Sequence, residues 1–388
     1  MASSHNLDPG TEYFSSTPAP KSLKCQEALA REFINYHAES DPPRRLVLVT
    51  SGGTTVPLEN QTVRFIDNFS AGSRGSTSAE YFLQEDYAVI FLHRQFSLLP
   101  YSRHYSHSTN CVLDFMDVEE TEEKTEAKQD DQEHAQHVER QQDSGNVIVR
   151  HEYQEKMRRV LRQYQAAKRK RMLLLLPFTT VTEYLFQLRS IATLMRPLGS
   201  RAMFYLAAAV SDFFIPTDKM AEHKIQSSDA PTNDIPHQRP ASKQLVINLD
   251  PVPKFLSTLV SAWAPCGSMI VSFKLETDPE LLLTKARLAL HRYHHDLVIG
   301  NLLTTRKWEV VFVSGEGERW IRVPKAKRSK SFSGDQHLVG QIEGKRDDTP
   351  VQGTEESSGD GLEIERLIVP ELKVLHTEMM QRSRNQCL

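Results

Sequence analysis

One short apolar run that ends in two glycines constrains the fold of this chain more than any other segment: RLVLVT followed by SGGT, at residues 45–54. A run of this length is typical of a strand buried on both faces, and such strands occur in parallel sheets covered by helices. Similar apolar runs recur along the chain, at residues 88–92, 172–176, 202–210, 245–249, 269–273 and 297–300. The sequence therefore predicts a large, mostly parallel sheet.

Segments with apolar residues at helical spacing lie between these runs. They predict helices at 21–39, from about residue 75, at 153–164, from Thr180, at 253–263 and at 279–294. Residues 308–313 and 319–323 predict a small terminal β-hairpin, and residues 362–379 a last helix interrupted at Pro370. Strands that alternate with such helices predict an α/β, Rossmann-like three-layer fold, with helices on both faces of the sheet and the hairpin at the end.

Residues 21–388 are predicted to form one Rossmann-like domain, because the chain is long enough to bury a sizeable core. Residues 1–20 are rich in Ser and Pro and are predicted to be disordered. The acidic, Gln-rich stretch 117–145 and the polar stretch 325–361 carry too few apolar residues to offset the entropy lost on ordering. Both are predicted to be disordered insertions in the domain.

The composition argues against several classes of protein. The net charge is −3, from 47 Lys and Arg against 50 Asp and Glu, which disfavours binding to nucleic acid or to a membrane surface. No apolar run approaches the ~20 residues of a membrane helix, and the N-terminus lacks the pattern of a secretory signal. Four well-separated cysteines predict a reduced, cytoplasmic protein without a disulfide framework: Cys25, Cys111, Cys266 and Cys387. The basic run at 168–171 is interpreted as a solvated helix end, with nuclear import as the alternative, so the nucleus stays open.

Small and polar residues follow the predicted strands, at 50–54, 208–213, 272–277 and 300–302. In parallel sheets, ligands bind beyond the carboxyl ends of the strands, so these four segments are expected to meet in one crevice. The glycine-rich segment 64–75 precedes a predicted helix, and glycines there let backbone N–H groups approach an anion at the helix N-terminus. Phosphate binding is the interpretation, although neither GxxxxGK[ST] nor a clean GxGxxG is present.

Six blocks taken together resemble phosphopantothenoylcysteine synthetase, in its eukaryotic stand-alone form. They are LVTSGGTTVPLE (48–59), VRFIDNFSAGSRGSTSAEYFL (63–83), FYLAAAVSDFFIP (204–216), EHKIQS (222–227), VSFKLETD (271–278) and the strand end at Asn301. The resemblance implies a ligase of coenzyme A biosynthesis that joins 4′-phosphopantothenate to L-cysteine. The substrate carboxylate attacks the α-phosphate of a nucleoside triphosphate, pyrophosphate leaves, and the cysteine amine displaces the nucleoside monophosphate from the acyl-nucleotidylate.

The resemblance also implies roles for individual residues. The positions that match nucleotide contacts in the family are Gly52, Ser70, Gly72, Gly75, Phe273 and Asn301. ATP is favoured as the nucleotide because the core resembles animal-type enzymes, with CTP left open. Mg²⁺ is expected with the triphosphate, and no residue is assigned as a metal ligand.

Two matches are assigned to catalysis. Asn68 matches the asparagine that holds the acyl intermediate, and Lys224 a lysine near the reacting phosphate and carboxylate. The positions that match phosphopantothenate contacts are Arg64, Ala208, Ala209 and Asp212. The resemblance further implies a homodimer in which the 208–212 segment reaches the neighbour's pocket.

Two other functions remain open. The chain is alternatively a non-catalytic scaffold that docks with other enzymes of the coenzyme A pathway, although a scaffold has no chemical need for Asn68, Lys224 and the glycine-rich loops. A Rossmann oxidoreductase is a third interpretation, which requires a better dinucleotide fingerprint than this chain carries.

Overall fold

A computed structural model describes residues 9–106, 111–119, 145–225, 245–324 and 361–386. Its main feature is a sheet of eight strands in the order β14-β13-β12-β11-β8-β1-β4-β7. The strands are β1 Leu46–Ser51, β4 Ala88–Arg94, β7 Leu173–Phe178, β8 Ala202–Leu206, β11 Met269–Glu276, β12 Leu297–Leu302, β13 Glu309–Ser314 and β14 Gly317–Arg322. The strands from β7 to β12 are parallel, and β13 and β14 add an antiparallel hairpin at one edge.

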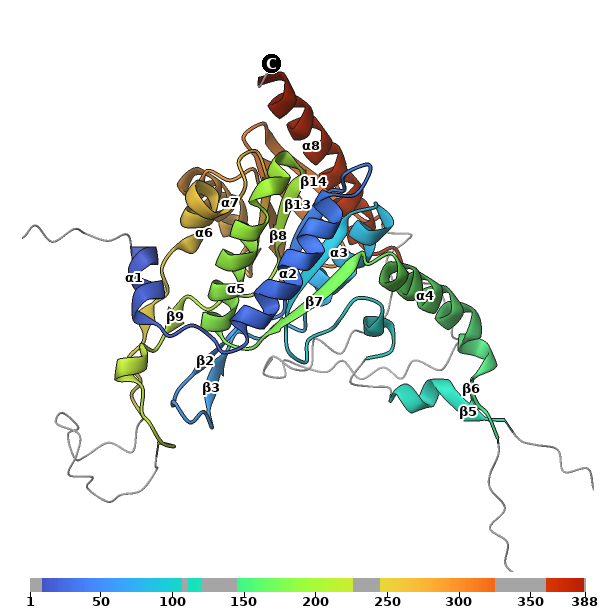
Figure 1. The fold of residues 1–388 in the computed structure, drawn as a ribbon, viewed down its shortest axis with the longest axis horizontal. Helices are drawn as coiled ribbons and strands as arrows, with labels where there is room; N and C mark the ends of the chain where they lie inside the picture. The colour runs from blue at the N-terminus through green and yellow to red at the C-terminus, as the bar shows by residue number, and fades with distance from the viewer. Residues whose placement is uncertain (1–8, 107–110, 120–144, 226–244, 325–360, 387–388) are drawn as a thin grey trace, which may run out of the picture.

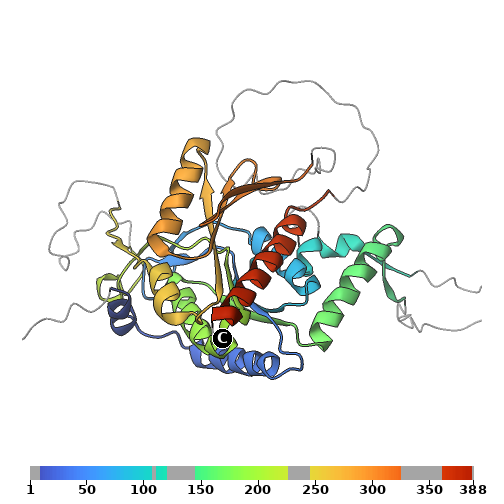
Figure 2. The same ribbon diagram turned by 90° about the horizontal axis from the view of Figure 1, so that it is seen from above.

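Helices cover both faces of this sheet (Figures 1 and 2). One face carries α2 Leu23–Ala38, α5 Val181–Leu194, the short α6 Phe255–Thr258 and α7 Pro279–Tyr293; the other carries α3 Ser73–Gln84 and α8 Glu365–Gln386. Helix α4, His151–Arg169, lies beside β7 at the edge. Alternate residues of the strands point to opposite faces, so that Leu48 packs toward α2 and α5 while Val49 packs toward α3 and α8. The predicted three-layer α/β fold is confirmed.

The chain order places a switch point at the centre of the sheet. Strands β4 and β7 follow β1 on one side, and the chain then crosses to β8 on the other side, so β1 pairs with both β4 and β8. Crevices for ligands form at such points, outside the carboxyl ends of the strands. A ligand site is therefore expected at the end of β1, at Ser51.

Three predicted elements differ from the structure. Residues 245–249 form no strand, and Leu245 and Val246 are mostly exposed, so this run does not enter the sheet. Strand β8 ends at Leu206 instead of 210, because the next residues turn to pair with the loop after β1. Helix α8 continues through Pro370, since one lost backbone bond is outweighed by the burial of Ile368, Val369 and Leu372 on the sheet.

The N-terminal segment is also more ordered than predicted. Residues Pro9–Ser16 form helix α1, and Tyr13 is only 4% exposed, with its hydroxyl 3.0 Å from Thr182 Oγ1. The predicted disorder of residues 1–20 is therefore wrong for α1, because buried aromatic packing offsets its polar composition. The insertions predicted at 117–145 and 325–361 fall largely outside the described residues.

Three of the four cysteines lie among the described residues. Cys25, Cys111 and Cys266 are free thiols. Among the described residues, every helix is too short or too polar to cross a membrane.

Candidate active site

The loop after β1 packs tightly against the segment that carries Asn68. A Cβ atom on Gly53 would overlap the carbonyl oxygen of Asn68, so only glycine fits there. The amide of Asn68 also donates to the carbonyl of Thr54 at 3.1 Å. The position of Asn68 is therefore set directly by the end of the central strand.

The residues after β8 lie along the same loop. The amide of Ala209 donates to the carbonyl of Gly52 at 2.8 Å, and the amide of Thr54 donates to the carbonyl of Ala209 at 3.0 Å. The amide of Ala208 donates to Thr50 Oγ1 at 3.1 Å. These bonds bring the predicted phosphopantothenate-contact residues Ala208 and Ala209 beside the predicted nucleotide-contact residue Gly52.

Helix α3 begins directly over the end of β1. Gly72 is its N-cap residue with φ +82°, a left-handed conformation that other residues adopt at a cost, and its carbonyl accepts a hydrogen bond from Ser51 Oγ at 3.0 Å. Gly75, one turn later, packs against the same serine. Ser70 Oγ accepts a long bond from the amide of Gly72 at 3.4 Å. The first turn of α3 thus lies against the end of β1, and the N–H groups at the start of a helix attract phosphate.

A loop that the sequence analysis did not assign to the site holds this glycine-rich segment from outside. The amide of Leu98 donates to the carbonyl of Ala71 at 2.9 Å, and Arg94 Nη1 pairs with Asp67 Oδ1 at 2.6 Å. Ser97 lies against both Gly52 and Gly72. The composition of residues 94–98 gave no signal of this role, because the contacts arise only when β4 lies beside β1.

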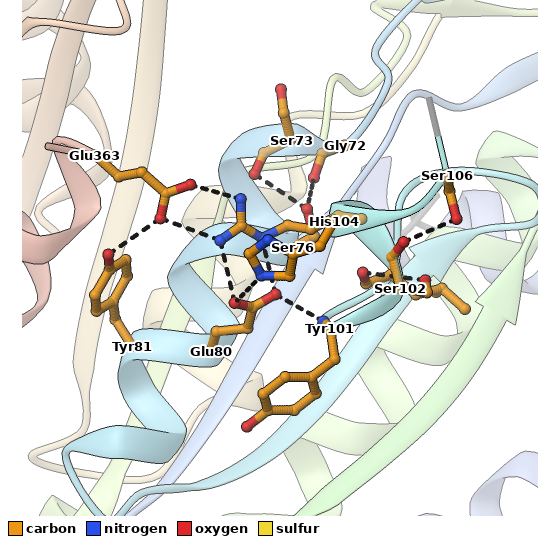
Figure 3. A network of polar contacts seen from close by, with 12 residues as sticks. Gly72, Ser73, Ser76, Glu80, Tyr81, Tyr101, Ser102, His104, Ser106 and Glu363 are labelled. Carbon is orange, nitrogen blue, oxygen red and sulfur yellow. Dashed lines mark hydrogen bonds and ion pairs between the residues drawn. The ribbon is translucent and has the colours of Figure 1, made fainter. Parts of the chain in front are cut away.

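A network of charged groups fixes the end of that loop to α3 (Figure 3). Arg103 Nε donates to Glu80 Oε1 at 2.8 Å, and Arg103 Nη1 donates to Glu363 Oε1 at 2.6 Å, just before α8. His104 and the amide of Tyr101 also bond Glu80, which is 4% exposed. Burial opposes ionisation of Glu80, but the bonds from His104 and Arg103 outweigh it and lower the pKa of this carboxyl. Glu80 is therefore a charged anchor between α3 and the loop.

The two residues expected at the nucleoside end lie on β11 and β12. Phe273 is half-buried, and its ring meets Tyr205 edge to face with centroids 4.9 Å apart. Asn301 is 6% exposed, and its Oδ1 has no hydrogen-bond partner among the described residues. Both side chains point to the face that carries α3, because each is two residues from a side chain packed there. A buried amide oxygen without a partner suits a ligand that donates a hydrogen bond.

A small hairpin, β2 Thr55–Pro57 and β3 Phe65–Asp67, extends from the site and projects from the body of the protein (Figure 1). Its turn is organised by Glu59, whose fully enclosed carboxylate accepts bonds from the amides of Arg64 at 3.0 Å and Ile225 at 3.4 Å. The amide of Arg64 is the main cause of a lowered pKa at Glu59. Arg64 Nη1 in turn donates to the carbonyl of Ile225 at 2.8 Å.

Lys224 precedes Ile225, so it is held at the turn of the hairpin, and its side chain is exposed. Asn68 follows β3 at the opposite end. Asn68 comes four positions after Arg64 along extended chain, which is a span of about 13 Å at the rise of a strand. Asp212 is also largely exposed and lies 3.5 Å from Lys254 Nζ. The structure therefore brings the glycine-rich loops, Ala208, Ala209 and Asn68 together. Within one chain, Arg64, Lys224 and Asp212 lie at the edge of this group.

Carboxylates are sparse at this site. Among the described residues, no group of three or more His, Cys, Asp or Glu side chains is arranged to hold a metal ion. Chemically, the crevice offers backbone N–H groups, one buried amide and nearby cations, which suit an anionic substrate with several phosphates.

Comparison with known proteins agrees with this chemistry. No protein-family model matches the sequence. Phosphopantothenate–cysteine ligase CAB2 of Saccharomyces cerevisiae is 48% identical over 322 residues, 80% of each chain. The human phosphopantothenate–cysteine ligase is 37% identical over 345 residues, 87% of this chain and 96% of the human one.

A solved structure is similar along almost the whole length. A histidine-to-alanine mutant of Cab2, in complex with phosphopantothenate-cysteine, matches with a TM-score of 0.73 and 41% identity, over 96% of this chain and 99% of that one. Sequence and fold agree over most of both chains. The chain therefore belongs to the phosphopantothenate–cysteine ligase family of coenzyme A biosynthesis.

Proposed function

We propose that this chain joins 4′-phosphopantothenate to L-cysteine with ATP as the activating nucleotide, in a homodimer with shared active sites. The observation that carries the proposal is the packing of Gly52, Asn68, Gly72 and Ala209 around the end of β1. An anion-binding loop and a substrate-contact segment meet there. The resemblance to animal-type enzymes favours ATP over CTP.

The chemistry explains why such a loop is needed. A carboxylate is a poor acylating agent at neutral pH, so it first attacks the α-phosphate, forming an acyl-nucleotidylate and releasing pyrophosphate. The cysteine amine then attacks the acyl carbon, and the nucleoside monophosphate leaves with the pair of electrons of the broken C–O bond. The N–H groups at the start of α3 stabilise the charge on the phosphates, and the side-chain amide of Asn68 donates to the acyl oxygen.

Mg²⁺ is proposed to enter with the triphosphate, where it supplies charge neutralisation. The sparse carboxylates of the crevice fit an ion held mainly by phosphate oxygens and water, as is usual for Mg²⁺. The protein's own part is to hold the triphosphate against α3.

The hairpin supports the homodimer. Apolar side chains on and beside β3 are at least one-third exposed: Val63 58%, Phe65 51%, Ile66 36% and Phe69 50%. Such a cluster on a projecting hairpin suits burial against a second copy of the chain. A partner's hairpin turn would bring Lys224 and Arg64 to the reacting groups. Within one chain, the backbone of Arg64 lies about 13 Å from that of Asn68 along β3.

A scaffold role explains less of the structure. The fit of Asn68 against Gly53 has no purpose in docking, and neither has the buried Oδ1 of Asn301, which finds no hydrogen-bond partner in the described part of the chain. The cytoplasm remains the proposed compartment, because the basic run 168–171 is interpreted as a solvated helix end and not as a signal for nuclear import. In this run, Arg171 pairs with Glu32 at 2.8 Å and lies over the ring of Tyr36.

The test is an assay of the purified full chain with phosphopantothenate, Mg²⁺ and either ATP or CTP, with and without cysteine. We expect pyrophosphate release and formation of phosphopantothenoylcysteine that depends on cysteine, with a higher kcat/KM for ATP. A protein that forms no product with either nucleotide would support the scaffold role and refute the ligase activity. A preference for CTP would refute only the choice of nucleotide.

A further inference from the structure

Arg94, the last residue of β4, carries a side chain to which neither the sequence motifs nor the proposed reaction assigns a role. It pairs with Asp67, the residue before Asn68, and the two side chains are 18% and 31% exposed. Among the described residues, this is the one hydrogen bond that a side chain of β3 makes with the eight-stranded sheet. The Arg94–Asp67 pair therefore ties the strand that leads into Asn68 to the body of the protein.

The side chain of Arg94 spans the loop that follows β1. Its Cβ lies beside Gly52, because a Cβ atom built on this glycine would come within 2.7 Å of it. Its guanidinium group meets Asp67, which pairs in register with Thr55. Gly52 has φ +84° and no side chain, which leaves the space that the arginine occupies. One side chain thus contacts the first residue of the loop and, through Asp67, the strand partner of its last residue.

The backbone of Arg94 is held firmly at the edge of the site. It pairs in register with Phe178 on β7, and the amide of Gln95 donates to the carbonyl of Phe178 at 2.7 Å. The carbonyl of Arg94 accepts a hydrogen bond from Ser97 Oγ at 2.8 Å. By contrast, β3 pairs with β2 alone among the described strands, over three residues that are all exposed. A side chain from a rigid strand therefore supports a strand that has little support of its own.

A second arginine–aspartate pair lies at the opposite end of β1 and β4. Arg44 comes two residues before β1 and pairs with Asp86, two residues before β4, also at 2.6 Å. Ion pairs at partly exposed positions contribute little to stability, so we expect neither pair to be needed for folding. The two pairs differ in what they lie beside. Only the Arg94–Asp67 pair adjoins a residue assigned to catalysis, where a displacement of about 1 Å costs about 100-fold in rate.

We propose that Arg94 is a positioning residue of the ligase reaction, which spans the loop after β1 and holds Asn68 in place through Asp67. The inference rests on the proposed function, in which the side-chain amide of Asn68 donates to the acyl oxygen. Arg94 does not touch the substrates in this role, because it acts on the backbone from which Asn68 extends. Formation of the acyl-nucleotidylate is the step that should depend on Arg94, since that step requires Asn68 and the reacting groups in a fixed geometry.

The kinetic test compares Arg94→Met and Arg94→Lys with a matched control, Arg44→Met. Arg94→Met should lower kcat for pyrophosphate release about tenfold, with the KM values for nucleotide and phosphopantothenate unchanged. The melting temperature should fall by about 2 °C or less. Arg94→Lys should restore most of kcat, since the pair uses a single hydrogen bond that an ammonium group can also donate. Arg44→Met should behave as the wild type.

Two kinetic results would overturn the proposal. One is a normal kcat in Arg94→Met. The other is a raised KM for the nucleotide with kcat unchanged, which would indicate that Arg94 binds phosphate directly.

Asp67→Asn completes a double-mutant cycle and keeps the proposal testable if Arg94→Met does not fold. If Arg94 acts through Asp67, then Asp67→Asn should lower kcat to the same degree as Arg94→Met. The double variant should be no slower than either single variant. Losses that multiply in the double variant would show that the two residues act separately, and the proposal would be wrong.

Hydrogen exchange of the ligand-free protein measures the effect of the Arg94–Asp67 pair without ligase activity. The amide of Asn68 donates to the carbonyl of Thr54 at 3.1 Å, so its exchange reports how firmly the segment is held. Residues 65–72 should exchange about tenfold faster in Asp67→Asn and Arg94→Met but not in Arg44→Met, while β1 stays protected. Unchanged exchange in both variants would refute the positioning role. If exchange responds as expected but the wild type forms no ligase product, the proposed function fails while the structural link to Asn68 stands.

Discussion

The glycine-rich loop at the start of α3 and the β2–β3 hairpin both carry residues of the proposed site but are built in opposite ways. The loop is enclosed: Ser51 is fully buried, and Gly53 and Gly75 are packed so closely that a Cβ atom would overlap their neighbours. The hairpin projects from the body and leaves Phe65 and Ile66 exposed (Figure 1). One chain therefore encloses the glycine-rich loop by itself, whereas the exposed apolar hairpin is the part that the proposed dimer would cover.

The difference has a physical basis. Phosphates need N–H groups whose geometry is fixed before the ligand arrives, and the backbone of a central strand and a helix N-terminus supply it. A hairpin of three-residue strands has little buried surface of its own, and its order depends on Glu59 and on the segment around Ile225. The effects of substitutions are therefore expected to differ between the loop and the hairpin.

The largest effect is expected from Gly53→Ala. The new methyl group would overlap the carbonyl of Asn68 and push that residue by more than 1 Å, and a displacement of this size costs about 100-fold in rate. We expect kcat/KM to fall at least about 100-fold in the coupled pyrophosphate assay.

Gly315→Ala is the matched control, because no atom lies within 4 Å of the position its Cβ would take. It should retain wild-type activity. If Gly53→Ala were as active as Gly315→Ala, the loop would be less rigid than the packing indicates, and the contrast with the hairpin would disappear.

Lys224→Gln tests the hairpin side of the comparison. The side chain is exposed, so the free energy of unfolding should change by no more than about 0.5 kcal/mol. Loss of a cation that stabilises charge in the reaction should lower kcat about 100-fold. Lys24→Gln, on the exposed side of α2, is the control and should alter neither quantity. Equal losses of kcat and stability in Lys224→Gln would contradict its role at the reacting groups.

Phe65→Glu should separate the two copies. A charge placed in an apolar contact costs about 2 kcal/mol or more, which raises the dimer Kd about 30-fold. Sedimentation should show monomers at micromolar concentration, and the specific activity should recover as the protein concentration is raised. Leu288→Glu on α7 introduces the same charge at a residue that is equally exposed, 54% against 51%, and should leave the dimer intact. A monomeric Phe65→Glu variant with full activity would show that each chain holds a complete site.

The sequence predicted the fold well where local signals and tertiary packing agree. The apolar run that became β1 and the capping box of Thr180 at the start of α5 both predicted their elements, and Thr180 Oγ1 accepts from the amide of Glu183 at 3.1 Å. The run at 245–249 has the same composition but forms no strand, because pairing depends on neighbours that composition does not reveal. Likewise Pro370 lies inside α8, where burial against the sheet outweighs a local preference.

The candidate site was accessible to sequence reasoning only where it consists of contiguous segments. The loops around Gly52 and Gly72 were singled out because strand, loop and helix follow one another in the chain, and Asn68 was assigned through the family resemblance. The charged pair of Glu80 and Arg103 was missed, since the two residues meet only through a loop that folds back over α3. The roles of the site residues remain predictions that the substitutions above test.

Two buried histidines in the body of the chain should have the smallest effect at neutral pH, because they lower the stability of the fold only on acidification. Burial lowers the pKa of His376 and of His295 to about 4, against about 6.5 in an unfolded chain. His376 is fully buried and neutral: its Nε2 donates to the carbonyl of Ser200 at 2.8 Å, and its Nδ1 accepts from Tyr87 at 2.9 Å. Between pH 6.5 and 4 the unfolded chain therefore binds protons that the folded chain does not.

Stability should consequently be full above pH 6.5 and fall as the pH drops toward 4, by roughly 2–3 kcal/mol for each histidine. Urea unfolding at several pH values measures this slope. His376→Gln should be less stable at pH 7 but should lose less stability on acidification, and an unchanged slope would rule out His376 as its source. The Phe65→Glu variant should keep the wild-type slope, because both histidines lie in the body, away from the hairpin that carries the proposed dimer contact. A slope that vanished with the dimer would mean that the body is not self-contained, and the comparison between the two regions would have to be abandoned.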